Sequence, residues 1–341
     1  MFRLDFNANG GGANVQEAIE RAGVSFAVVF LAVGLGSGIA AVAKAQPNGP
    51  LPGPLPLFPP NNWWNVDITN APVDSNSAGF LSYIGGEGLH PDFGGKDPTF
   101  PEIYGMVHVS VPGTQPLRQV TFVEYGDQSD AGAPGRPTGY PIPDEAKTQP
   151  VVDADPRWIE GGYPGNLVGC PNGDRHMLLV DRDNRLLYEL YHLCWDAAQN
   201  RWEAGSGAIF SLDGNDFRPE TWTSADASGM AIFPGLVRHD EAMSGSPIRH
   251  AFRFTVHGVN GHVFPATHDA TTGTTAAPPL GARLRLYARL GCRKSVATRV
   301  ALFSAVSNWV GYGWVAGAVF ASGAVPVPAD WDIGLGVLRL L

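Results

Sequence analysis

Charged residues are scarce in this chain. They make up 16% of its 341 residues, against about 25% in an average soluble domain. Disordered chains combine high charge with low hydrophobicity, whereas 44% of these residues are hydrophobic. Basic residues are also fewer than acidic ones, since 23 Lys and Arg stand against 32 Asp and Glu, for a net charge of −9. A chain without a basic footprint does not bind nucleic acid well, so we expect a globular protein with a different partner.

Standard catalytic and cofactor motifs are also missing. The sequence contains no Gly-rich dinucleotide fingerprint, phosphate-binding loop, GxSxG elbow or HExxH zinc motif. The three cysteines lack the CxxC spacing of structural zinc sites. Cys170 and Cys194 flank a predicted strand pair and either form a disulfide, leaving Cys292 over, or remain buried thiols. No cofactor is therefore expected.

Glycine and proline, by contrast, are frequent. The 43 Gly and 29 Pro make up about one residue in five, which excludes coiled coils and long helix bundles. Short apolar runs alternate with turn clusters, a pattern typical of strands. We therefore predict an all-β fold, a β-sandwich or jelly-roll-like domain with long loops and one short C-terminal helix. The expected strands are 104–111, 119–125, 176–180, 186–191, 208–212, 250–256 and 283–290, followed by a buried helix over 295–310 and a strand near 314–321.

The N-terminal part of the chain predicts export. Residues 24–43 carry no charge and end at Ala43-Lys44-Ala45, whose small residues suit signal peptidase. Twenty apolar residues are also long enough for an uncleaved membrane anchor. Residues 46–60 contain seven prolines and predict a stiff spacer. We therefore expect a signal peptide or anchor over 1–45, a spacer over 46–60 and a single β-rich domain over 61–341, secreted or periplasmic.

Five residues are candidates for catalysis. In the predicted strand 250–256, His250 shares a face with apolar residues, which suits a core histidine as well as a functional one. The segment 222–241 is long and irregular, a common property of functional loops, although a packed Ω-like loop explains it equally well. Carboxylates there can act as acid, base or nucleophile, and imidazoles can assist them. The candidates are Asp226 and Asp240, with Glu189 as substitute, assisted by His176 and His250.

Other polar and aromatic residues are candidates for substrate binding. Tryptophans beside polar turns can stack on sugar rings, although tryptophan is also an ordinary core residue. Asp174 shares a strand face with His176 and is placed to orient its ring. The remaining candidates are Trp222, Arg238, Arg253, His90 and Asp92.

These residues together favour an exported carbohydrate-active protein, a glycan-cleaving hydrolase with paired carboxylates. Its partner would be a polysaccharide or cell-wall glycan, and we expect a monomer that meets the membrane only through its N-terminal segment. One alternative is a non-catalytic module that binds glycan or the cell envelope. A second is a metal-dependent hydrolase, whose ligands would be His90, Asp92, His176 and His250.

One set of motifs resembles a known family. The chain carries GDRH at 173–176, LYELY at 187–191, TWTSADASG at 221–229, PGLVRHDE at 234–241 and RHAFRFTV at 249–256. This pattern resembles a family of exported bacterial proteins without an assigned function, over about residues 57–290. The resemblance implies one exported domain and supplies no catalytic roles.

Overall fold

The structure is a computed structural model. It describes residues 44–85, 95–96, 103–130, 132, 135–148, 157–161, 173–287, 302–305, 320–321 and 337–340. The chain divides into two units, Met1–Val42 and Ala43–Leu341. The described fold belongs to the second unit, and the predicted apolar segment 24–43 lies outside the described residues.

Strands dominate the described fold. They are β1 (Gln46–Pro47), β2 (Gly95–Lys96), β3 (Ile103–Tyr104), β4 (His108–Val111), β5 (Val120–Phe122), β6 (Met177–Asp181), β7 (Leu186–Tyr191), β8 (Cys194–Asp196), β9 (Arg201–Ala204), β10 (Ser206–Ser211), β11 (Val237–Arg238), β12 (Phe252–Thr255), β13 (Leu284–Tyr287), β14 (Leu302–Ala305), β15 (Phe320–Ala321) and β16 (Val337–Leu340). The helices are α1 (Ser77–Ile84) and α2 (His239–Met243), with 3-10 turns η2 (Gly126–Gln128), η3 (Asp144–Thr148) and η4 (Phe233–Gly235). The predicted all-β domain with a short helix is confirmed.

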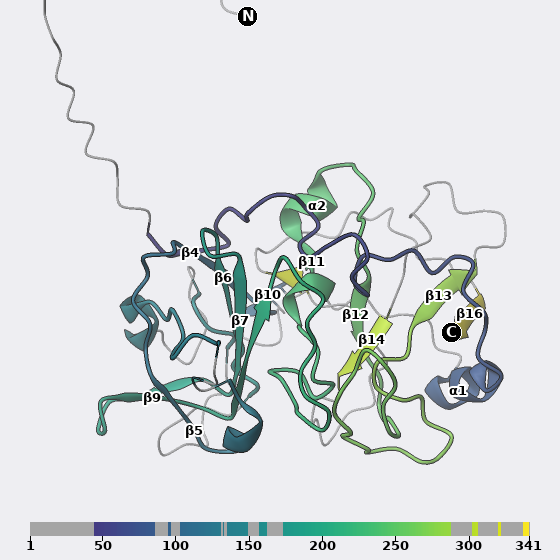
Figure 1. Cartoon of the computed structure of the whole chain (residues 1–341). Helices are drawn as coiled ribbons and strands as arrows, with labels where there is room; N and C mark the ends of the chain where they lie inside the picture. Colours follow the sequence, from purple (N-terminus) through teal and green to yellow (C-terminus); the bar gives the residue numbers. More distant parts are fainter. Residues whose placement is uncertain are drawn as a thin grey trace, which may run out of the picture. The chain divides into compact units, whose positions relative to one another are not determined.

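A five-stranded sheet forms the centre of this fold. Its strand order is β1-β4-β6-β7-β10, and Figure 1 shows β4, β6, β7 and β10 side by side. The pair β4–β6 is parallel, whereas the other neighbours are antiparallel. One row of aligned residues crosses four strands, from His108 through Leu178 and Glu189 to Ala208. Aligned residues project from the same face of a sheet, so His108 and Glu189 share one face.

Both faces of this sheet are covered. On one face, Leu179, Tyr188 and Ile209 pack against Trp202 and Ala204 of the three-stranded sheet β5-β9-β8. On the opposite face, the alternating residues of the same strands pack against the loop over 225–236, which contains η4. The apolar residues of that loop are Ala225, Ala231, Ile232, Phe233 and Leu236. Burial on both faces explains why β6 and β7 are nearly continuous apolar runs in the sequence.

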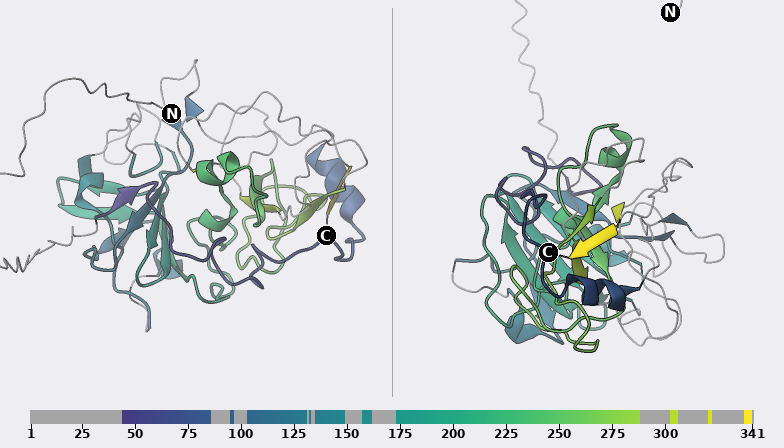
Figure 2. Two further views of the ribbon diagram at one scale, coloured as in Figure 1. Left: turned by 90° about the horizontal axis from the view of Figure 1, so that it is seen from above. Right: turned by 90° about the vertical axis from the view of Figure 1, so that its right-hand side faces the viewer.

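A third cluster of buried side chains surrounds β12. Phe254 and Val256 pack there with Trp64, Val259 and Leu284. Strand β12 pairs in parallel with β14, and β13 pairs antiparallel with β16. Helix α1 lies beside β16 in both views of Figure 2.

Most strand predictions are confirmed, and two features were not expected. The residues Leu302–Ala305 form β14, so the predicted helix over 295–310 is wrong there. The expected spacer over 46–60 instead belongs to the fold, because β1 pairs with β4 and Leu57 and Phe58 are buried in the core. Cys194 is disulfide-bonded, while Cys170 and Cys292 lie outside the described residues. In the part of the chain that the structure describes, no helix has both the length and the apolar character to cross a membrane.

Candidate functional site

A pocket lies where the first described segment meets β4 and the start of α2. Its volume is about 310 Å³, at the lower end of the range typical of small-molecule sites. Three chain segments contribute to its wall, far apart in the sequence. The lining residues are Asn48, Gly49, Pro50, Leu51, Leu55, His108, Arg238, His239 and Asp240.

Backbone pairing holds the first segment at this place. The Asn48 amide donates to the His108 carbonyl at 2.7 Å, which extends the β1–β4 pairing by one residue. The Ser110 hydroxyl donates to the Pro50 carbonyl at 2.5 Å. A Cβ atom on Gly49 would lie 2.9 Å from the Ser110 Cβ, so only glycine allows this close approach. The pocket wall is therefore fixed to the edge of the central sheet.

His108 is the least exposed titratable group of the pocket. It is 5% exposed, and its Nε2 lies 3.0 Å from the Gly49 carbonyl oxygen, so Nε2 carries the proton that is donated there. Burial lowers the pKa of His108 to about 4, so the ring is neutral at neutral pH. Nδ1 then offers a lone pair, and it has no hydrogen-bond partner among the described residues. One nitrogen of this pocket-lining residue is thus a buried acceptor without a partner among the described residues.

Arg238 also lines the pocket, directly before α2. Its side chain is buried, and Nε donates to Oδ1 of Asp240 at 3.0 Å. Nη2 lies 2.8 Å from Oε1 of Glu241. Burial would raise the pKa of Glu241, but His250, whose Nε2 is 3.1 Å from the carboxylate, and Arg238 together lower it. The two carboxylates therefore offset the guanidinium charge.

A second polar group lies in the interior and is centred on His176. Its Nδ1 is 2.6 Å from Oε2 of Glu160, and its Nε2 is 3.1 Å from the Ala225 carbonyl oxygen. Burial opposes the charged ring, yet Glu160 outweighs burial and raises the pKa of His176 to about 9. The pKa of Asp174 is raised, chiefly by burial. Glu160, which the sequence did not single out, orients His176 in place of the predicted Asp174.

Asp226 and Glu189 are also buried and already bound. Asp226 accepts from Arg253 Nη2 at 3.1 Å and from the Ser228 hydroxyl. Glu189 is 0% exposed, and its carboxylate accepts the backbone N–H groups of Ile232, at 2.8 and 3.0 Å, and of Phe233, at 2.8 Å. Burial nevertheless raises the pKa of Glu189 to about 7. Glu189 thereby fastens the η4 loop to the sheet.

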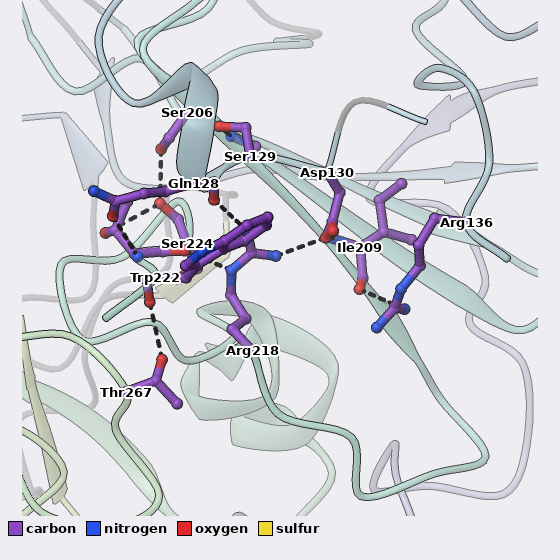
Figure 3. A network of polar contacts seen from close by, with 12 residues as sticks. Gln128, Ser129, Asp130, Arg136, Ser206, Ile209, Arg218, Trp222, Ser224 and Thr267 are labelled. Atoms are coloured by element: carbon purple, nitrogen blue, oxygen red, sulfur yellow. Dashed lines mark hydrogen bonds and ion pairs between the residues drawn. The ribbon is translucent and has the colours of Figure 1, made fainter. Parts of the chain in front are cut away.

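Trp222 belongs to a separate network around Arg218. Figure 3 shows Arg218 reaching toward Asp130, with Trp222 beside its guanidinium. Arg218 Nη1 donates to Oδ2 of Asp130 at 2.6 Å, and its guanidinium carbon lies 5.4 Å from the centre of the Trp222 ring. The Ile209 amide donates to the same carboxylate at 2.8 Å. This network ties loops to β10, which is a structural role.

The structure thus separates the predicted site residues. Arg238 and Asp240 lie together at the pocket, and His250 reaches it only through Glu241. Asp174, His176, Asp226, Glu189 and Arg253 lie in the interior or at its edge. His90 and Asp92 lie outside the described residues, and within the described ranges no group of three or more His, Cys, Asp or Glu is arranged to hold a metal ion.

His108 is the site residue that sequence reasoning missed. It stands in an alternating apolar strand, and nothing in that pattern distinguishes a pocket histidine from one packed in the core.

Comparison with known proteins gave one short similarity. The chain is 42% identical over 62 residues to the inner membrane protein YbhN of Escherichia coli (strain K12), which is 18% of this chain and 20% of that protein. The chain therefore spans about a fifth of the length of this relative. No protein-family model and no solved structure matches the chain.

This similarity corrects the expected function and location. The relative is an inner membrane protein, which contradicts our expectation of a secreted or periplasmic, carbohydrate-active hydrolase. The alternative of a glycan-binding module is also withdrawn, because it depended on the same expectation that the chain is exported.

Proposed function

We propose that this domain reversibly binds a small organic ligand in the pocket between residues 48–55 and the start of α2. The observation that carries the proposal is the pocket itself, in which Pro50, Leu51 and Leu55 supply apolar surface for a ligand and His108, Arg238 and Asp240 supply polar groups. Apolar walls with a few polar groups are typical of ligand sites.

The geometry favours binding over the cleavage of a glycosidic bond. Cleavage needs two carboxyl groups that flank the bond in one open cleft. Asp226 and Glu189 are buried and saturated by their partners, whereas Asp240 is mostly exposed and paired with Arg238. These carboxylates occupy different environments, and the pocket contains only Asp240 among them.

Blocking the pocket tests this proposal. Leu55 is 48% exposed, so Leu55→Trp adds bulk at the pocket without disturbing the core. Leu117→Trp is the matched control, because Leu117 is 43% exposed and does not line the pocket. Saturation-transfer NMR with hexylamine, hexanol and hexanoate should show at least one bound compound for the full chain and for the control. The signal should disappear in Leu55→Trp.

Two results would overturn the pocket assignment. One is equal binding to the wild type and to Leu55→Trp. The other is the absence of a signal from all three compounds.

We also propose that the chain is attached to a membrane through residues 24–43. Two observations support this second proposal: the twenty uncharged residues of that segment and the similarity to an inner membrane protein. The full chain should stay in the membrane pellet after an alkaline carbonate wash. The double variant Leu31→Arg/Leu35→Arg should be released, since charges near the centre of a bilayer are costly. Release of the wild-type chain by the wash would refute attachment.

A further inference from the structure

We propose that three aromatic side chains at the surface, Trp63, Phe217 and Phe264, form a binding site for a quaternary ammonium group. None of these residues, the aromatic cluster, lines the pocket between residues 48–55 and the start of α2. The inference is therefore independent of the function proposed for that pocket.

Three segments that are far apart in the sequence bring the rings together. Trp63 lies between β1 and α1, Phe217 follows β10, and Phe264 lies between β12 and β13. The ring centre of Phe264 is 5.8 Å from that of Trp63 and 5.9 Å from that of Phe217, and the centres of Trp63 and Phe217 are 6.4 Å apart. The three rings thus form one contiguous group instead of three scattered side chains.

Two of the three rings are turned to solvent. Phe217 is 58% exposed and Phe264 is 64% exposed. Trp63 is half-buried and packs against the buried side chains around β12, so it fixes the aromatic cluster to the core. Single exposed apolar residues are normal on a protein surface, whereas contiguous ones are typical of interaction sites. The exposed ring surfaces are therefore available to a partner.

Carboxylates lie beside the aromatic cluster. Asp216 directly precedes Phe217, and Glu220 follows it three residues later with a side chain that is 70% exposed. Oε1 of Glu220 is 2.7 Å from Nε2 of His262, which stands two residues before Phe264. Glu220 thereby lies next to both segments that carry the phenylalanines. Its charge and that of Asp216 attract a cation and repel an anion.

The neighbouring cation does not cancel this preference. Arg218 follows Phe217 in the sequence but is only 4% exposed, and its Nη1 donates to Asp130 in the interior. Its charge is paired there, away from the solvent that surrounds Phe217.

The rings themselves select the kind of cation. The face of an aromatic ring attracts a positive charge within about 6 Å of the ring centre. Phenyl rings provide no oxygen or nitrogen acceptor, so a primary ammonium or a guanidinium group would give up hydrogen bonds to water without replacement. A quaternary ammonium group has no N–H donor and presents methyl groups, so it loses least when it leaves water for an aromatic surface.

Titration of the full chain with choline and with 3,3-dimethylbutan-1-ol tests the proposal, because the two compounds differ only in the exchange of the charged nitrogen for carbon. Saturation-transfer NMR on their methyl signals measures binding. We expect choline to bind about fivefold more tightly, the preference typical of a cation on exposed aromatic rings. The double variant Phe217→Leu/Phe264→Leu keeps the surface apolar and should abolish this preference. Tyr125→Leu is the matched control and should retain it, since Tyr125 is 39% exposed and lies outside the aromatic cluster.

Three results would overturn the proposal. The first is binding of 3,3-dimethylbutan-1-ol that equals or exceeds that of choline. The second is a choline preference that survives in the double variant, and the third is loss of choline binding in Leu55→Trp, which would assign the ammonium group to the pocket. The single variant Phe264→Leu provides the same comparison if the double variant does not fold.

A second ligand distinguishes the source of the ammonium group. Dihexanoyl phosphatidylcholine, kept below its micelle concentration, carries the same group on a lipid. Tighter binding than choline would support a lipid headgroup as the ligand, and equal binding would support a free ammonium compound. Loss of the choline preference when only the pocket is blocked would count against this site, whereas failure of the hexyl compounds to bind would count only against the pocket.

Discussion

Replacement of Glu189 by glutamine tests the most deeply buried carboxyl group of the fold. Glu189 lies in the central sheet, 0% exposed, and its oxygens accept the N–H groups of Ile232 and Phe233. Those bonds favour the ionised form, but burial outweighs them and raises the pKa from the ordinary 4.5 to about 7. Glutamine has nearly the same shape and stays uncharged at every pH.

The expected magnitude follows from the linkage between protonation and folding. Below pH 4.5 the group is protonated in both states, and its full contribution to stability is present. As the pH rises toward 7, the unfolded chain loses the proton first, so the native state loses stability. The interval from 4.5 to about 7 corresponds to about 3 kcal/mol, because each tenfold change in an equilibrium constant is ~1.4 kcal/mol. The unfolding free energy of Glu189→Gln, measured relative to that of the wild type, should therefore increase by about 3 kcal/mol between pH 4 and pH 8.

Urea unfolding followed by tryptophan fluorescence measures this difference. Comparing variant with wild type at pH 4, 5.5, 7 and 8 cancels the titration of all other groups. Asp213→Asn serves as the control. Its unfolding free energy relative to the wild type should change by less than about 1 kcal/mol over the same pH values, since the ion pair of Asp213 with Arg185 is at the surface. A difference that stays constant with pH would refute the reasoning. An increase in the stability of the wild type relative to Glu189→Gln as the pH rises would also refute it, because the three N–H contacts would then keep the carboxylate ionised.

Two further predictions concern other parts of the fold. Gly229 has φ +78°, and an added Cβ would lie 2.1 Å from the Thr267 hydroxyl, so Gly229→Ala should lower the unfolding free energy by about 3 kcal/mol or more. At Gly245, with φ +70° and no atom within 4 Å, the same change should cost only about 1 kcal/mol; equal urea midpoints for the two variants would contradict the packing argument. The pKa of His176 is raised to about 9, so the stabilisation by its charged ring is complete below pH 6.5 and is lost as the pH rises through 9. The stability difference between the wild type and His176→Gln should shrink by about 3 kcal/mol from pH 6 to pH 9.5, and a constant difference would show a neutral ring.

Local patterns in the sequence were sufficient for most of the strands. The turn at 183–184 and the apolar runs on either side predicted the hairpin of β6 and β7, because its hydrogen bonds join neighbours in the chain. Alternation in 250–256 placed Phe254 and Val256 on one buried face, as observed. The helix expected over 295–310 failed at Leu302–Ala305, which pairs with β12 about fifty residues earlier. A short apolar run does not reveal whether a distant strand will pair with it.

The candidate site was likewise predictable from the sequence only in part. The segment 222–241, which the sequence marked as long and irregular, supplies Arg238 and Asp240 to the pocket. The proline-rich residues 46–60 read as a spacer, because stiff extended chain and an edge strand have the same local signature. Their pairing with β4 at the sheet edge, which brings Gly49 against His108, depends on residues about sixty positions away.

By itself, the sequence determined the β class, the hairpins, the charge balance and the residues able to do chemistry, because these depend on composition and on neighbours in the chain. The tertiary structure decided which of those residues are saturated and which remain free. Burial raised the pKa of Glu189, which accepts from backbone N–H groups, while the carboxylate of Glu160 raised the pKa of His176 against the effect of burial. The fold also brought His108, Arg238 and Asp240 together in the lining of one pocket. Solvation and hydrogen-bond partners are properties of the packed chain, so only the fold could select the candidate site.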